Sequence, residues 1–204
     1  LTVFMVMGAW RISKARVLTR KAAAIETLGS ATVLCTDKTG TLTQNRMSIV
    51  ELCQNSPDVV EIGALASQKE SHDPVDLAFL TAAQMQSPPE KLRHYGLTPD
   101  FLAMTNIYSE NAKYFAASKG APETIMQLCR MNEQQASDIR AAMEDMATRG
   151  MRVLAVARAD NITAPFPDNP TDLSFQFSGL VGLADPLRET VPDAVKEAQN
   201  AGIK

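Results

Sequence analysis

Hydrophobic and polar positions follow two periods along the chain, and together they predict alternating strands and helices. Short apolar runs rich in β-branched residues predict strands, and residues 31–35 (ATVLC) predict a buried parallel one. Apolar residues that recur every three to four positions predict helices. The predicted strands are residues 31–35, 47–52, 101–108, 113–118, 151–159 and 175–183. The predicted helices are residues 21–28, 58–68, 74–85, 122–130, 133–148 and 189–201.

The order of these elements predicts one α/β domain that is interrupted by an insert. Asp73 is a suitable N-cap and Pro74 a suitable first residue for the helix that follows. The turn at residues 109–111 joins two strands into a hairpin, which is typical of an antiparallel sheet. We therefore expect an α+β insert within an α/β domain. Because a helix ends at Gly202, where another parallel strand is expected, we also expect the chain to stop inside that outer domain.

The first ten residues carry no charge, and basic residues follow from Arg11 onward. A bilayer-spanning helix needs about 20 apolar residues, so this run alone is too short. It is either the end of a membrane helix that leaves on the basic, cytoplasmic side, or an ordinary buried helix or strand. These residues by themselves do not decide between the two.

Composition excludes several classes of function. The chain has 20 basic and 23 acidic residues and a net charge of −3, so we expect no nucleic-acid partner. Its three cysteines lack the spacing of a metal site or a disulfide framework, which favours reduced thiols. The two histidines are isolated in the sequence and are interpreted as surface or structural residues.

A polar loop, residues 36–43, follows the first predicted strand and has Asp37 as its second residue. Ligands of open α/β sheets lie at the carboxyl ends of strands, where a carboxylate can attack a phosphoryl group. Lys38 adds positive charge, and Gly40 lets the backbone turn closely around an oxyanion. Such chemistry needs a divalent metal, because carboxylate and phosphate repel one another. The alternative is a polar turn with an Asp cap.

The seven residues 37–43 (DKTGTLT) resemble the phosphorylation motif of P-type ATPases, the cation pumps that form an aspartyl phosphate. Residues 24–31 are similar to the segment before that motif in the calcium-pump-like branch. The resemblance implies a phosphorylation domain of the haloacid dehalogenase type, with a Rossmann-like fold. Asp37 would be phosphorylated, Lys38 and Thr41 would line the phosphate pocket, and the Asp37 carboxylate with the Thr39 carbonyl would bind Mg²⁺.

Four later motifs resemble the nucleotide-binding part of the same family, and imply that ATP is the ligand. They are SHDPVDLA (71–78), KGAPE (119–123), GMRVLAVA (150–157) and GLADPLR (182–188). The residues that they assign to the nucleotide or to the hinge beside it are Asp73, Asp76, Lys119, Gly120, Arg152, Asp185 and Arg188.

One departure from the family concerns the base. Leu97 stands where many members have an aromatic residue that stacks on adenine, and Leu102 stands where they have a lysine. Tyr95 and Phe101 are nearby aromatics that either replace the stacking residue or belong to the core. The nucleotide preference is therefore open.

The resemblance assigns residues 1–21 to the end of a membrane helix and its stalk, and residues 22–52 to the first part of the phosphorylation domain. Residues 53–160 are expected to form the nucleotide-binding domain, and residues 161–204 to return to the phosphorylation domain. The chain is then a soluble piece of the cytoplasmic face of a membrane protein. It would bind ATP and Mg²⁺, and the transported cation would bind membrane helices outside these residues.

We expect these 204 residues alone to be catalytically inactive. One alternative is a nucleotide-binding or regulatory module without chemistry of its own. A second is a soluble phosphatase of the haloacid dehalogenase group, whose members carry a second Asp two residues after the nucleophile. Thr39 occupies that position here and disfavours the phosphatase. Without that base the phosphoenzyme should hydrolyse slowly, which suits a pump.

Overall fold

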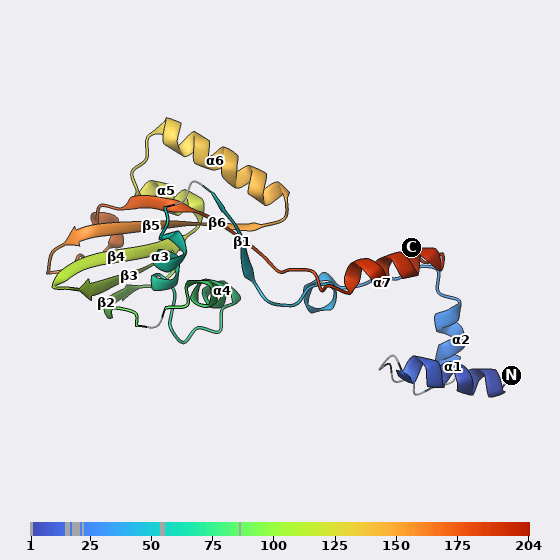
Figure 1. Cartoon of the computed structure of the whole chain (residues 1–204). Coiled ribbons are helices and arrows are strands. Elements are labelled where there is room, and N and C mark those ends of the chain that lie inside the picture. The colour runs from blue at the N-terminus through green and yellow to red at the C-terminus, as the bar shows by residue number, and fades with distance from the viewer. Residues whose placement is uncertain (1, 15–16, 18–20, 22, 54–55, 86) are drawn as a thin grey trace. The chain divides into compact units, whose positions relative to one another are not determined.

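A computed structural model describes residues 2–14, 17, 21, 23–53, 56–85 and 87–204 of the chain (Figure 1). The chain divides into two compact units. The larger unit is Asn45–Pro186, and the smaller unit combines Leu1–Gln44 with Leu187–Lys204.

The larger unit is built on one six-stranded sheet, in which every neighbouring pair of strands is antiparallel. The strand order is β1-β6-β5-β4-β3-β2, so β1 and β2 are its edges. The strands are β1 (Ser48–Cys53), β2 (Glu90–Tyr95), β3 (Ala103–Glu110), β4 (Lys113–Gly120), β5 (Arg152–Ile162) and β6 (Gln176–Ala184). The antiparallel sheet agrees with the predicted α+β insert, but it also includes β1 and β6, which the sequence analysis assigned to the outer domain.

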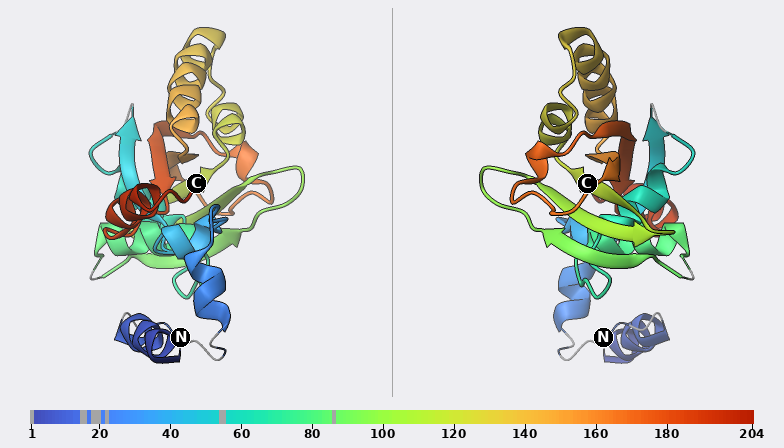
Figure 2. Two further views of the ribbon diagram at one scale, coloured as in Figure 1. Left: turned by 90° about the vertical axis from the view of Figure 1, so that its right-hand side faces the viewer. Right: turned by 90° about the vertical axis from the view of Figure 1, so that its left-hand side faces the viewer.

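Helices cover both faces of the sheet and enclose two cores (Figure 2). One face carries α3 (Val59–Leu65) and α4 (Pro74–Ala83), and the other carries α5 (Pro122–Leu128) and α6 (Glu133–Thr148). Alternation along β4 shows why two cores form: Phe115 and Ala117 pack toward α3, whereas Ala116 packs toward α5. The larger unit is thus a three-layer α/β domain.

Local sequence signals explain the boundaries of several elements. The side chains of Asn132 and Gln135 form a capping box, which begins α6 at the predicted residue. The β3–β4 hairpin turns at Asn111 and Ala112, whose φ angles are 50° and 61°. Positive φ at both positions is the geometry of a two-residue type I′ turn, so the turn lies later than the predicted residues 109–111.

The smaller unit contains three α-helices among its described residues: α1 (Thr2–Lys14), α2 (Ala23–Gly29) and α7 (Val191–Asn200). Within the described part of the chain, no helix has the length and apolarity needed to cross a membrane. Residues 1–21 were assigned to the end of a membrane helix and its stalk, and of these, residues 1, 15–16 and 18–20 lie outside the described residues.

The predicted strand at residues 31–35 is wrong. The segment is extended and exposed, with Val33 and Leu34 both at least 60% accessible. Its neighbour among the described residues is a single position: Lys204 N donates to Thr32 O, and Leu34 N donates to Lys204 O. That is a parallel pairing one residue long, and strand geometry needs a longer ladder.

Strand β2 was not among the predicted elements. Its sequence, EKLRHY, is mostly polar, and it forms an edge of the sheet, where charged residues are common. Its pairing with β3 places Tyr95 opposite Thr105.

Candidate functional site

A pocket of about 580 Å³ lies in the larger unit beside the beginning of α4 and the end of β4. Five of the sequence-predicted site residues line it, namely Asp73, Asp76, Lys119, Gly120 and Arg152. The remaining lining residues are Gln68, Ser71, Val75, Leu97, Leu102, Met104, Ala121, Pro122, Val153 and Leu154. Residues distant in sequence therefore meet at one concave surface.

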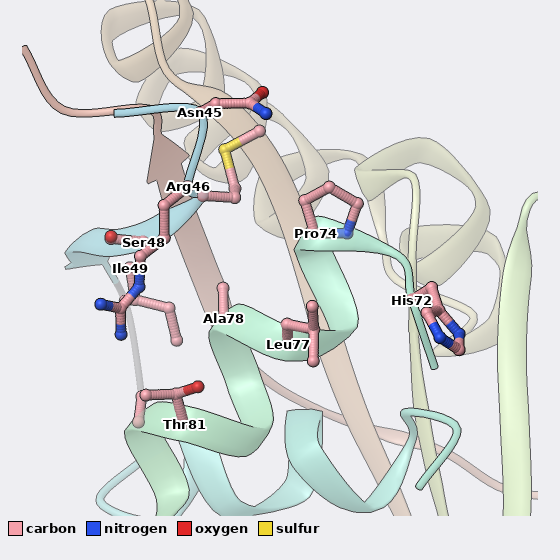
Figure 3. Close-up of a pocket in the computed structure, with 11 residues that line it drawn as sticks. Asn45, Arg46, Ser48, Ile49, His72, Pro74, Leu77, Ala78 and Thr81 are labelled. Carbon is pink, nitrogen blue, oxygen red and sulfur yellow. The ribbon is translucent and has the colours of Figure 1, made fainter. Parts of the chain in front are cut away.

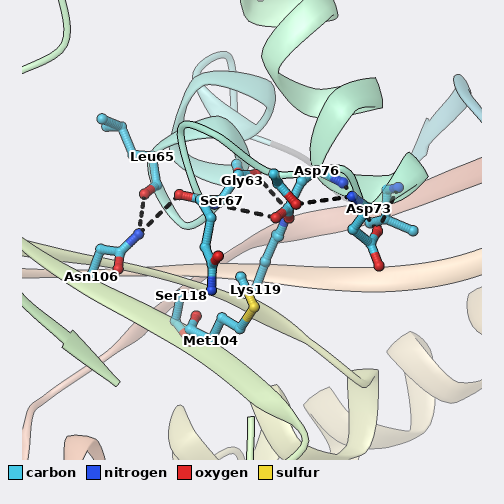
Figure 4. A network of polar contacts seen from close by, with 12 residues as sticks. Gly63, Leu65, Ser67, Asp73, Asp76, Met104, Asn106, Ser118 and Lys119 are labelled. Atoms are coloured by element: carbon cyan, nitrogen blue, oxygen red, sulfur yellow. Dashed lines mark hydrogen bonds and ion pairs between the residues drawn. The ribbon is translucent and has the colours of Figure 1, made fainter. Parts of the chain in front are cut away.

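A buried ion pair forms one wall of this pocket (Figure 4). Lys119 Nζ lies 2.5 Å from Asp76 Oδ1 and 2.5 Å from Ser67 Oγ. The side chains of Lys119 and Asp76 are only 5% and 7% exposed. The ammonium also lies 4.6 Å from the centre of the Phe79 ring, which adds a cation–π contact.

The beginning of α4 positions Asp76. Asp73 caps the helix, because its Oδ1 accepts hydrogen bonds from Val75 N at 2.7 Å and Asp76 N at 3.4 Å. Asp76 follows in the first turn, and its Oδ2 accepts a hydrogen bond from Gln68 N. Asp73 thus has a structural role that is complete without a ligand.

The surroundings of Asp76 favour its ionised form. Burial raises the pKa of the Asp76 carboxyl. The hydrogen bond and charge of Lys119, together with hydrogen bonds from Ser71 and Gln68, lower this pKa by more than burial raises it. The net pKa of Asp76 lies below its ordinary value. Burial also lowers the pKa of the Lys119 ammonium, and Asp76 opposes this change.

Close backbone packing explains the glycine after Lys119. A Cβ atom at Gly120 would overlap the carbonyl oxygen of Leu102 and lie 2.5 Å from Ala103 Cα. The hydrogen bond from Ala121 N to Leu102 O fixes the same approach. Packing against the start of β3 therefore requires glycine here, whether or not a ligand also contacts it.

Arg152 opens β5 and is an exposed cation at the rim of the pocket. Within the described residues, no carboxylate pairs with its guanidinium. Arg158, six positions further along the same strand, is by contrast paired with Asp160 at 2.9 Å. Arg152 is thus available to an anionic ligand.

Two aliphatic side chains form the apolar part of the rim. Leu97 and Leu102 are 60% and 52% exposed, at the positions where the resemblance expects a stacking aromatic and a lysine. Tyr95 and Phe101 instead pack against the core on the α5 and α6 face. The structure therefore agrees with the interpretation of Tyr95 and Phe101 as core residues.

The sequence analysis missed the polar network behind the ion pair. Asn106 Nδ2 donates to the carbonyl oxygens of Leu65 and Ser67 (Figure 4). Tyr108 Oη also donates to Leu65 O. These bonds hold the end of α3, and with it the Ser67 hydroxyl that contacts Lys119. The clue in the sequence is Asn106, an amide side chain in the middle of a predicted strand.

The Asp37 loop belongs to the smaller unit and is shaped by a tight turn. Thr39 (φ −76°, ψ 121°) and Gly40 (φ 78°, ψ −11°) have type II turn geometry, which needs the positive φ that glycine allows. Thr43 is 1% exposed and closes the loop through Thr43 N to Lys38 O. Its hydroxyl also accepts from Gly40 N. Asp37 Oδ1 accepts from Lys38 N at 2.8 Å.

The last two predicted residues lie elsewhere. Asp185 Oδ1 accepts a hydrogen bond from Arg46 N in the larger unit and is not part of the pocket lining. Arg188 lies in the smaller unit, where its guanidinium donates to the carbonyl oxygens of Gly40 and Thr41. The structure therefore relates Arg188 to the Asp37 loop.

Among the described residues there is no group of three or more His, Cys, Asp or Glu side chains that would hold a metal. The Asp37 carboxylate and the Thr39 carbonyl are oxygen ligands, which Mg²⁺ prefers. Mg²⁺ typically binds one or two carboxylates and takes its other ligands from water and phosphate. The two predicted ligands fit that pattern.

A second pocket, of about 640 Å³, lies between β1 and α4 (Figure 3). It is lined by Arg46, Ser48 and Ile49 on the strand side, and by Leu77, Ala78 and Thr81 on the helix, among others. None of the predicted site residues lines it. His72 lies at its edge, and no other histidine joins it there.

The larger unit coincides closely with the segment that a known protein family matches. A family model described as "P-type ATPase, cytoplasmic domain N" matches residues 47–190. The larger unit, Asn45–Pro186, is nearly the same segment.

Similar proteins include ATPases from three organisms, and each alignment covers the whole of this chain. A Methanocaldococcus jannaschii protein named as a cation-transporting ATPase is 32% identical over 212 residues. A Dictyostelium discoideum protein named as a plasma membrane ATPase is 31% identical over 214 residues, and calcium-transporting ATPase 1 of Bacillus cereus is 25% identical over 242. The chain spans 25%, 20% and 27% of the lengths of these relatives.

Proposed function

Because the chain belongs to the P-type ATPase family, we propose that it is the ATP-binding and phosphate-accepting portion of a cation pump. In the full-length protein it binds Mg-ATP and accepts the γ-phosphate on Asp37. The observation that carries the nucleotide-binding part is the pocket in which Asp76, Lys119 and Arg152 meet. The smaller unit then contributes to a phosphorylation domain of the haloacid dehalogenase type.

The pocket offers different chemistry at its two ends. Leu97 and Leu102 provide an apolar surface for the face of a base, and the Asp76 carboxylate can accept a hydrogen bond from an exocyclic amine. The unpaired guanidinium of Arg152 suits the phosphates, because it can donate two parallel hydrogen bonds to one phosphate group. We therefore place the base toward Asp76 and the phosphates toward Arg152.

Phosphoryl transfer uses the Asp37 loop. One Asp37 carboxylate oxygen attacks the γ-phosphorus, the bond to the β,γ-bridging oxygen breaks, and ADP leaves with that electron pair. The product is an aspartyl phosphate. Lys38 and Thr41 would meet the phosphoryl oxygens. Mg²⁺, held by the Asp37 carboxylate and the Thr39 carbonyl, would reduce the repulsion between the two anions.

Slow hydrolysis of the phosphoenzyme follows from Thr39. A threonine hydroxyl is a poor general base compared with a carboxylate, so water attack on the acyl phosphate is not accelerated from this position. This favours an intermediate that persists during transport over a soluble phosphatase. These residues do not determine which cation is transported.

The test of phosphoryl transfer is Asp37→Asn in the full-length protein. An amide of nearly the same shape is a poor nucleophile, so acid-stable label from γ-labelled ATP should disappear while ATP binding remains. Thr36→Ala, which changes the neighbouring exposed residue, is the matched control and should keep the label. Label retained in the Asp37→Asn variant would contradict the assignment of Asp37.

A further inference from the structure

Arg188 binds three successive carbonyl groups of the Asp37 loop. Its Nη2 donates to Gly40 O at 2.9 Å, and its Nε donates to Thr41 O at 3.1 Å. Its own backbone N donates to Leu42 O at 2.9 Å. Thr43, the next residue of the loop, forms a β-bridge with Leu187. One residue, separated from the loop by almost 150 positions, therefore fixes its outer side.

These contacts determine how the peptide units of the loop are oriented. The C=O and N–H groups of a trans peptide point in opposite directions. Because the carbonyls of Gly40 and Thr41 face Arg188, the N–H groups of Thr41 and Leu42 are turned to the opposite side. Successive backbone N–H groups on one side of a turn form a concave anion-binding surface. The Thr43 hydroxyl lies inside the loop, where it accepts a hydrogen bond from Gly40 N and donates one to Lys38 O.

We propose that Arg188 is a positioning residue for phosphoryl transfer: its guanidinium holds the loop so that Asp37 and the loop amides are aligned with the incoming phosphoryl group. The proposal rests on the function proposed above. It differs from both roles that the resemblance offers Arg188, which are support of the hinge and contact with the nucleotide. Two donors of the guanidinium already bind backbone carbonyls, so the loop is the partner that the structure assigns.

The chemistry of arginine suits this role. The guanidinium is planar, and its donors form a rigid fork that can span two neighbouring acceptors. A lysine ammonium is a single point and cannot reproduce both bonds at once. Misalignment of about 1 Å can slow a reaction by roughly 100-fold. Loss of the two guanidinium hydrogen bonds should therefore reduce the rate of phosphoryl transfer without changing nucleotide affinity.

The test compares two phosphoryl donors in the full-length protein with Mg²⁺ present. ATP carries a base and ribose, whereas acetyl phosphate carries neither and releases acetate with the electron pair of the broken P–O bond. For Arg188→Ala, the maximal rate of aspartyl phosphate formation should fall roughly 10- to 100-fold with both donors. The half-saturating concentration of ATP and its dissociation constant should change less than about twofold. Arg188→Lys should recover only part of the rate.

Controls separate this proposal from the proposed function and from loss of the fold. Arg140→Ala removes another exposed arginine, paired with Glu133 on α6, and should leave both rates unchanged. Asp37→Asn should abolish the label with either donor, and label retained there would contradict the proposed function instead. Thermal unfolding identifies a destabilised variant, and if Arg188→Ala is destabilised, the comparison is made with Arg188→Lys.

Two results would overturn the role of Arg188. One is a weaker affinity for ATP together with unchanged phosphorylation by acetyl phosphate, which would place Arg188 on the nucleotide. The other is a normal rate with both donors in a folded variant that lacks the guanidinium. An equal loss of rate with both donors, at unchanged ATP affinity, supports the proposal.

Discussion

Lys119 Nζ lies 2.5 Å from Asp76 Oδ1, and both side chains are almost fully buried at the wall of the candidate nucleotide pocket. The two residues come from different elements, β4 and α4, so their pairing joins the sheet to the helix that covers it. The same pair therefore contributes to the stability of the domain and to the shape of the pocket.

Lys119→Met should destabilise the domain strongly. The substitution keeps most of the side-chain volume but leaves the Asp76 carboxylate buried without its counter-charge. Breaking a buried ion pair in this way typically costs about 3–5 kcal/mol. Urea unfolding followed by circular dichroism measures the change in the free energy of unfolding.

A double substitution separates the charge from the packing. Lys119→Met combined with Asp76→Asn removes both charges, so its cost should be smaller than the sum of the two single costs. Arg140→Ala, at an exposed ion pair on α6, should shift the urea midpoint little. Additive costs at Lys119 and Asp76 would mean that the pair does not interact in solution.

Stability should fall in acid because of Asp76. Its burial raises the carboxyl pKa, but its hydrogen-bond donors lower the pKa in the folded state below the unfolded value of about 3.9. The stabilisation is therefore present above about pH 4 and is lost as the pH falls through the lower, folded pKa. Thermal melts between pH 7 and pH 2 should show a smaller decline for Asp76→Asn than for the parent chain. Parallel declines would contradict the lowered pKa.

The three thiols should differ in reactivity. Cys35 is exposed, whereas burial raises the pKa of the Cys129 thiol to about 12, so little thiolate exists at neutral pH. Iodoacetamide labelling followed by mass spectrometry should modify Cys35 first and Cys129 last, and denaturant should abolish the difference. The Cys35→Ser variant should lack the fast phase. Equal rates for Cys35 and Cys129 in the folded chain would contradict the burial of Cys129.

Local signals predicted the elements that depend on local interactions. Helix α6 was predicted with its observed bounds, and in the structure a capping box begins it and Ala136, Ile139 and Met146 are buried along it. The prediction of a strand at residues 31–35 was wrong for the opposite reason. Its apolar residues are typical of a strand, but a strand forms only when a second strand pairs with it. Strand β2 was missed because its polar sequence gains its structure from pairing with β3.

The candidate site was predictable only through its motifs. Asp76 and Lys119 are 43 positions apart, and opposite charge alone does not select this pair among 23 acidic and 20 basic residues. The resemblance placed both near one ligand, and the structure shows that they contact each other. Ser67 carries no signal of this kind, because its hydroxyl reaches Lys119 only after Asn106 and Tyr108 fix the end of α3.

Calorimetric titration of the 204-residue chain with Mg-ATP tests the central claim most directly, with Arg152→Ala as the informative variant. We expect weak but saturable binding, and losing one charge-assisted phosphate contact, worth about 1.5–3 kcal/mol, should reduce affinity roughly 10- to 150-fold. Arg158→Ala changes an arginine of the same strand that is paired with Asp160 outside the pocket, and it should bind as the parent does. Absence of saturable binding, or equal affinity in the parent and Arg152→Ala, would contradict the assignment of this pocket to ATP.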